Sequence, residues 1–272
     1  MSGARDLATG PPASVGAGQP EAVDPDLDHI RWHDLECGGY KADLALWRTL
    51  ADEQLATGGE AATRVLDLGS GTGRVSLDLS SRGHRVLGVD VDPVFCAELR
   101  RRAALRHLSA AAAVSDAREL RLGERFALIV APMQTVQLLD GPTGRAALLQ
   151  GIREHLAPGG VAAIAIVEDV EPFGADEAAH LAPDMKDHGG TVYASRPVGV
   201  TVDDGRIVLD RVREIVTPVG DRRVSSDRTV LDVLDADGLE DEGRAVGLRV
   251  LPAREVVATE EHVGSRVVMF GV

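Results

Sequence analysis

Residues 65–73 read Val-Leu-Asp-Leu-Gly-Ser-Gly-Thr-Gly and are the most informative stretch of the chain. The apolar run before the glycines is short and nearly continuous, as in a strand that is buried on both faces. The alternating glycines permit tight backbone turns and the close approach of a ligand that a Cβ would obstruct. Val75 and Leu79 follow at helical spacing. The stretch therefore predicts a strand, a glycine loop and a helix.

The same alternation of strand and helix continues toward the C-terminus. An apolar run ends at Asp90, and Asp92-Pro93 supplies an N-cap and a first-turn proline for the next helix. Strands that alternate with helices indicate a parallel sheet with right-handed crossovers. The expected elements are strands at 64–68, 85–89, 111–114, 126–130 and 161–167, with helices from 74, from 93 to about 107, and from 143 or 144 to 156.

The segments that flank this region have a different character. Residues 1–27 are rich in Gly, Pro, Ala and Asp, so we expect a disordered leader before a single domain at 28–272. A first helix is expected from Asp43. Residues 190–235 hold β-rich segments around a tight turn and predict an antiparallel insertion. A helix at 236–246 and strands at 249–258 and 265–270 close the chain.

Composition limits the function classes. The chain has 272 residues and a formal net charge of −14, which fits one large domain and disfavours nucleic-acid and membrane-surface binding. Its two cysteines exclude a disulfide scaffold and multi-cysteine zinc sites. No apolar stretch is long enough for a signal peptide or a membrane span. We expect a cytoplasmic protein without a metal site.

The acids at the strand ends indicate the ligand. Asp90 lies 21 residues after Gly69, where a carboxylate can bind both ribose hydroxyls of an adenosine cofactor. Arg74 stands where a dinucleotide-binding loop has its third glycine, and Asp67 would repel a pyrophosphate. Because Asp67 suits a ligand with an amino group and no phosphate, S-adenosylmethionine is favoured over a nicotinamide dinucleotide.

Residues 65–73, together with Gly88-Val89-Asp90-Val91-Asp92-Pro93, resemble a class I S-adenosylmethionine-dependent methyltransferase. Residues 115–118 and 156–160 also match that family, as an acid after the third strand and a turn before the fifth. The resemblance implies an α/β Rossmann-like sheet of seven strands in the order 3-2-1-4-5-7-6, with an antiparallel last strand. It also implies that the insertion at 190–235 forms a wall on the acceptor side.

The resemblance further implies a role for each matched residue. Asp67, Gly69 and Gly71 would hold the methionyl moiety, and Asp90 the ribose. Tyr40 would close over the methionyl end, and Pro132, after the fourth strand, would line the same edge. The adenine would lie against Val91, Asp116 and Ala117.

The acceptor side carries less information. Gln134 and Gln137 follow the fourth strand and are candidate acceptor residues, and His188 is a candidate base because histidine titrates near neutral pH. The segment lacks the Asn/Asp-Pro-Pro-Tyr type tetrapeptide of enzymes that methylate adenine or glutamine amides. A small-molecule acceptor is therefore favoured, with S-adenosylhomocysteine as the by-product.

The sequence leaves several questions open. The methyl group could pass to nitrogen or to oxygen, and the protein could be a monomer or a homodimer. An alternative function is cofactor binding without methyl transfer, as in a cyclase or a ligand sensor. A nicotinamide-dependent oxidoreductase is a weaker alternative.

Overall fold

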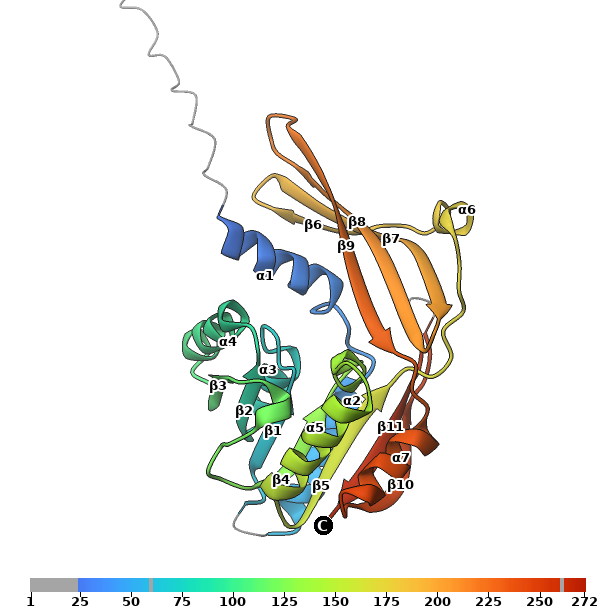
Figure 1. Cartoon of the computed structure of the whole chain (residues 1–272). Helices are drawn as coiled ribbons and strands as arrows, with labels where there is room; N and C mark the ends of the chain where they lie inside the picture. The colour runs from blue at the N-terminus through green and yellow to red at the C-terminus, as the bar shows by residue number, and fades with distance from the viewer. Residues whose placement is uncertain (1–23, 59–60, 260–261) are drawn as a thin grey trace, which may run out of the picture.

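The computed structural model describes residues 24–58, 61–259 and 262–272. Over these ranges the larger sheet has seven strands, in the order β10-β11-β5-β4-β1-β2-β3 (Figure 1). Strands β1 to β5 run parallel to one another, whereas β11 is antiparallel to both β5 and β10. From the other edge this is the predicted order 3-2-1-4-5-7-6, so the predicted fold is confirmed.

The strands of the larger sheet are β1 (Arg64–Leu68), β2 (Arg85–Asp90), β3 (Ala110–Val114), β4 (Phe126–Ala131), β5 (Leu156–Ile166), β10 (Arg249–Val256) and β11 (Ser265–Gly271). The helices are α1 (Pro25–Glu36), α2 (Leu44–Ala56), α3 (Arg74–Ser80), α4 (Pro93–Leu105), α5 (Pro142–His155), α6 (Ala175–Ala178) and α7 (Ala236–Ala245), with short 3₁₀ turns η1 (Ala117–Glu119) and η2 (Thr135–Leu138).

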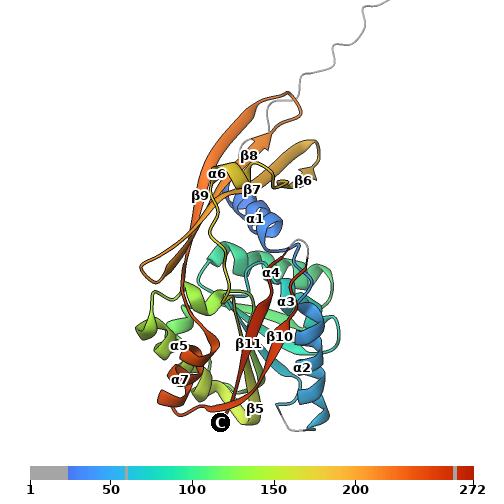
Figure 2. The same ribbon diagram turned by 90° about the vertical axis from the view of Figure 1, so that its right-hand side faces the viewer.

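The central strands are buried on both faces, which explains their continuous apolar sequence. In β11, Val267 and Met269 join the core under α2 and α3, while Val268 and Phe270 join the core under α5 and α7. Successive side chains of a strand point to opposite faces, so both sets must be apolar. The result is a three-layer arrangement whose strand ends face the insertion (Figure 2).

The insertion is a separate antiparallel sheet in the order β6-β7-β8-β9. It is longer than the predicted 190–235 on its N-terminal side, because β6 adds a strand before residue 190. That strand is almost entirely exposed and polar, so it carries no apolar signal in the sequence. The last strand of the insertion also begins with exposed residues, so its first half carries little signal in the sequence. The strands are β6 (Asp184–His188), β7 (Thr191–Asp203), β8 (Arg206–Val216) and β9 (Arg222–Asp232).

Helix α1 was not predicted, and it corrects the boundary of the expected leader. Residues 25–27 form its first turn, and Asp24 caps it by accepting hydrogen bonds from the backbone N–H groups of Asp26 and Leu27. Residues 1–23 lie outside the described residues. Helix α1 lies between α4 and the insertion sheet (Figures 1 and 2). None of the helices that the structure describes is long and apolar enough to cross a membrane.

Candidate functional site

The glycine loop after β1 has the backbone shape that the sequence predicts. Gly69 and Gly71 have φ angles of +67° and +51°, which residues other than glycine rarely adopt. A Cβ at Gly69 would lie 2.6 Å from the side chain of Thr135, and a Cβ at Gly71 would collide with the imidazole of His33. The two glycines therefore let both neighbours approach the backbone directly.

Asp90, at the end of β2, holds this loop in place. One carboxylate oxygen accepts a hydrogen bond from the Gly71 N–H at 2.8 Å, and the other accepts from the Asp92 N–H at 3.0 Å. Val91 follows at the same edge and is 69% exposed, an unusual position for a valine that directly follows a buried strand. A carboxylate beside an exposed apolar side chain suits a ligand with a ribose and a flat apolar ring.

Asp67 is buried in the middle of the site, with only 1% of its surface exposed. One carboxylate oxygen accepts a hydrogen bond from the Ser76 hydroxyl at 2.6 Å, and the other has no partner among the described residues. Burial raises the pKa of Asp67 to about 6, since the charged form loses its hydration. A buried carboxylate oxygen without a partner fits a ligand that brings a positively charged amino group.

Asp116 and Ala117 lie at the neighbouring strand end. The backbone N–H of Ser115 donates to the carbonyl of Asp90 at 3.0 Å, which ties the end of β3 to the end of β2. The Asp116 carboxylate caps η1 and pairs with Arg118, and the Arg118 hydrogen bonds lower the pKa of Asp116. The acids at the ends of three adjacent strands thus lie along one edge of the sheet, in the order β3-β2-β1.

Tyr40 lies on the connection between α1 and α2. Its ring meets His262 edge-to-face at 4.9 Å, and the Arg74 guanidinium lies 5.3 Å from the ring centroid. Burial raises the pKa of Tyr40. Arg74 in turn pairs with the buried Asp43, so the position that replaces a third glycine carries a structural ion pair. The position of the Tyr40 ring is therefore fixed by its contacts with both His262 and Arg74.

The two candidate glutamines have different environments. Gln134 is half-buried, and its side chain makes no hydrogen bond within the described residues. Gln137 is fully buried; its amide donates to the carbonyls of Val167 and Asp232, and its oxygen accepts from the Val167 N–H. Gln137 thus fastens η2 to the end of β5 and to the end of β9. Its donors are already used, so we leave it out of the acceptor residues.

His188 lies on the insertion sheet rather than at the strand ends. Its ring meets Tyr193 edge-to-face at 5.5 Å, and its buried Nε2 has no hydrogen-bond partner among the described residues. Burial lowers the pKa of His188, and the charges of Arg31 and Lys186 lower it further. The imidazole is therefore neutral at pH 7 and able to accept a proton.

The sequence did not reveal that α1 reaches the glycine loop. The His33 ring lies against Gly71 and 4.3 Å from the ring of Phe95, and burial lowers its pKa. Asp34 accepts a hydrogen bond from the Thr72 hydroxyl at 2.7 Å and pairs with Arg102. The Asp24-Pro25 pair is the signal that could have located this helix, because it repeats the N-cap and proline of Asp92-Pro93.

The other face of α1 is bound to the insertion sheet. Trp32 packs edge-to-face on Tyr193 at 5.0 Å, and Glu36 accepts hydrogen bonds from Ser195 and Arg213 at 2.7 and 2.6 Å. These contacts fix the insertion sheet beside the strand ends. Within the residues that the structure describes, no group of three or more His, Cys, Asp or Glu side chains could hold a metal ion.

Residues 65–160 match the model of a methyltransferase-domain family. These residues form a class I S-adenosylmethionine-dependent methyltransferase domain. The matched range begins at β1, contains the glycine loop and the acids at 67, 90 and 116, and ends at the turn within β5. The predicted family is therefore confirmed.

A curated methyltransferase matches part of the chain. The chain is 34% identical over 107 residues to a cypemycin N-terminal methyltransferase from a Streptomyces species, which covers 39% of this chain and 43% of that relative. The match thus spans less than half of the curated relative.

Two solved structures share the fold over nearly the whole chain. The sugar N-methyltransferase KedS8 from Streptoalloteichus is 17% identical, with a TM-score of 0.68 and coverage of 97% of this chain and 98% of that one. The amino pentose methyltransferase CalS10 from Micromonospora echinaspora, solved with bound S-adenosylmethionine, is 19% identical, with a TM-score of 0.65 and coverage of 93% and 99%. The methyltransferase domain and its insertion therefore belong to one shared architecture.

Proposed function

We propose that the protein transfers a methyl group from S-adenosylmethionine to an amine nitrogen of a small molecule. The observation that carries the cofactor assignment is the row of acids at three strand ends, with the exposed Val91 beside Asp90 and an unpaired buried oxygen on Asp67. An amine acceptor is supported by the names of three similar proteins: the curated relative is an N-terminal methyltransferase, and the two solved structures are a sugar N-methyltransferase and an amino pentose methyltransferase.

The strand-end residues would bind the cofactor as follows. Asp90 would accept hydrogen bonds from the ribose hydroxyls, and Asp67 would pair with the amino group of the methionyl end. Asp116 and Ala117 would lie at the adenine, with Val91 against its face. The rest of the cofactor would lie against Gly69, Gly71, Tyr40 and Pro132.

Bound S-adenosylmethionine supplies an electrophilic methyl group on a sulfonium sulfur. An amine attacks this carbon with its lone pair, a new N–C bond forms, and the C–S bond breaks to give S-adenosylhomocysteine. Most of the acceleration can come from holding the acceptor in line, so no strong base is required. Gln134 and Thr135 would orient the acceptor from η2, and the methylated ammonium would release its proton to water, because the lowered pKa of His188 makes its imidazole a weaker base than an alkylamine.

The glutamine pair provides a test with a matched control. Replacing Gln134 by alanine should leave the melting temperature and the cofactor affinity unchanged while lowering turnover of an accepted amine. Replacing Gln137 by alanine should instead lower the free energy of unfolding by about 1–3 kcal/mol, because buried carbonyl and N–H groups lose their partners.

The measurements for this pair are thermal unfolding, cofactor titration and formation of S-adenosylhomocysteine with a panel of small amines. Turnover equal to wild type in Gln134→Ala would remove that residue from the acceptor side. Methylation of hydroxyl compounds but of no amine in the panel would contradict an amine acceptor.

A further inference from the structure

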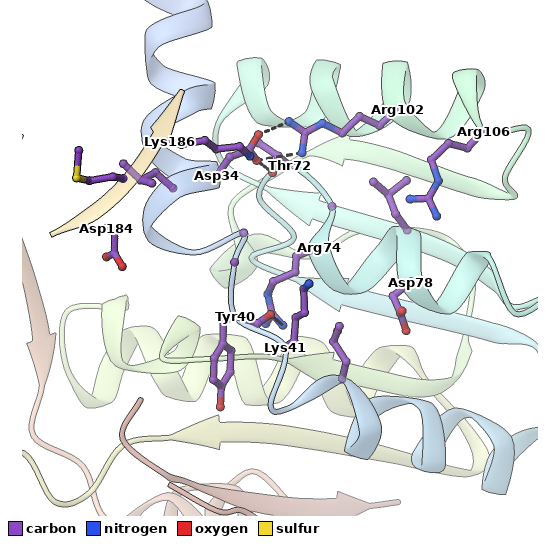
Figure 3. A pocket seen from close by; sticks show the side chains of 17 residues that line it. Asp34, Tyr40, Lys41, Thr72, Arg74, Asp78, Arg102, Arg106, Asp184 and Lys186 are labelled. Atoms are coloured by element: carbon purple, nitrogen blue, oxygen red, sulfur yellow. Dashed lines mark hydrogen bonds and ion pairs between the residues drawn. The ribbon is translucent and has the colours of Figure 1, made fainter. Parts of the chain in front are cut away.

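A cavity of about 630 Å³ lies beside the glycine loop, outside the row of strand-end acids. Its walls are the end of α1, the connection at 38–41, the start of α3, the C-terminal end of α4 and strand β6 of the insertion (Figure 3). Small-molecule sites in proteins fall in the range of about 300–1,000 Å³. The cavity therefore has room for a metabolite rather than for a single ion.

Cationic side chains are concentrated around this cavity. The chain has a formal net charge of −14 and only two lysines, Lys41 and Lys186, and both line the cavity together with Arg106. Across the described part of the chain, these three side chains have no hydrogen-bond or ion-pair partner. They reach the cavity from three different elements, so the fold brings together charges that are far apart in the sequence.

The acids in the cavity wall do not neutralise these cations, because each already has an arginine partner. The pairs are Asp34 with Arg102 at 2.5 Å, Asp78 with Arg48 at 2.6 Å and Asp184 with Arg211 at 3.9 Å. The cavity thus keeps an excess of positive charge on a strongly acidic protein. A concave surface lined by one sign of charge concentrates ligands of the opposite sign.

We propose that this basic cavity binds a phosphorylated small molecule. Lysine ammonium groups bind phosphate as point charges, and an arginine adds a forked donor, so Lys41, Lys186 and Arg106 together suit a group with several charged oxygens. The proposal does not depend on methyl transfer, because anion binding can be measured on the protein without cofactor or acceptor.

The test is titration calorimetry with inorganic pyrophosphate at constant ionic strength. The double variant Lys41→Gln/Lys186→Gln should bind pyrophosphate about tenfold or more weakly than wild type, since two charge-assisted contacts are lost. Arg121→Gln is the matched control: Arg121 is exposed, has no described partner and lies outside the cavity, so this variant should bind as wild type does.

A second readout uses the fact that Lys41 and Lys186 are the two lysines of the chain. Pyrophosphate should slow acylation of both Lys41 and Lys186 by an amine-specific reagent several-fold, as followed by peptide mass spectrometry. Absence of pyrophosphate binding, wild-type affinity in the double variant, or an equal loss in Arg121→Gln would overturn the proposal. S-adenosylmethionine titration of the same samples separates this failure from failure of the proposed function, because neither lysine is among the proposed cofactor residues.

Discussion

Replacing Asp90 by alanine is expected to weaken S-adenosylmethionine binding at least about a hundredfold. Each hydrogen bond to a charged group contributes about 1.5–3 kcal/mol, and the Asp90 carboxylate would make two to the ribose. The variant also removes the acceptor for the Gly71 N–H, which holds the glycine loop in its left-handed conformation. Loss of loop order and loss of ribose contacts therefore act in the same direction.

The Asp90→Asn variant separates these two effects. The amide oxygen can still accept from Gly71, so the loop should stay in place, while the amide nitrogen loses the hydrogen bond from the Asp92 N–H and offers the ribose a donor instead of an acceptor. We expect an intermediate affinity in calorimetric titration and a melting temperature between those of wild type and Asp90→Ala. An Asp90→Ala protein that is folded and binds the cofactor with wild-type affinity would refute the ribose assignment.

The second large effect is expected at Asp67, where stability and cofactor affinity should change in opposite directions. Burial raises the pKa of Asp67 to about 6, so the carboxylate is charged at pH 8 at a cost to the folded state. A shift of about two pH units corresponds to roughly 1–3 kcal/mol. Asp67→Asn should therefore be more stable than wild type at pH 8 and should bind S-adenosylmethionine at least about tenfold more weakly.

The direction in which the free energy of unfolding changes with pH follows from proton binding. Between the unfolded pKa of 3.8 and the folded pKa of about 6, the folded state holds more protons than the unfolded state. The free energy of unfolding therefore falls as the pH rises through this window, and the destabilisation is complete above it. The advantage of Asp67→Asn should fall to about half by pH 5 and vanish only below the unfolded pKa of 3.8, as thermal unfolding at pH 8 and at pH 5 will show. A variant less stable than wild type at pH 8 would contradict a charged, incompletely bonded Asp67.

The sequence predicted the larger sheet well because its signals are local. In β1 and β5 a short apolar run is bounded by glycine, and Asp92-Pro93 marks the start of α4 within the same few residues. The acids at the ends of β1, β2 and β3 were predicted to lie at one edge of the sheet, because the carboxyl ends of parallel strands lie together. Their spacing along the chain was enough to place them.

The features that were missed depend on contacts between distant segments. Helix α1 is held by polar contacts on two sides, such as Asp34 with Arg102 and Glu36 with Arg213, so its apolar residues do not form one stripe. Strand β6 is polar because it lies at an exposed edge. Gln137 resembled an acceptor residue because the carbonyl groups that it binds come from residues 30 and 95 positions away.

Calorimetric titration of the purified protein with S-adenosylmethionine, S-adenosylhomocysteine and NADH tests the cofactor site most directly. Mass spectrometry should first show that no cofactor has been carried through purification. The strand-end acids predict that the first two ligands bind and that NADH does not displace them, since Asp67 opposes a pyrophosphate at this site. Displacement of S-adenosylmethionine by NADH, or no binding of S-adenosylmethionine and S-adenosylhomocysteine to a cofactor-free protein, would contradict the account.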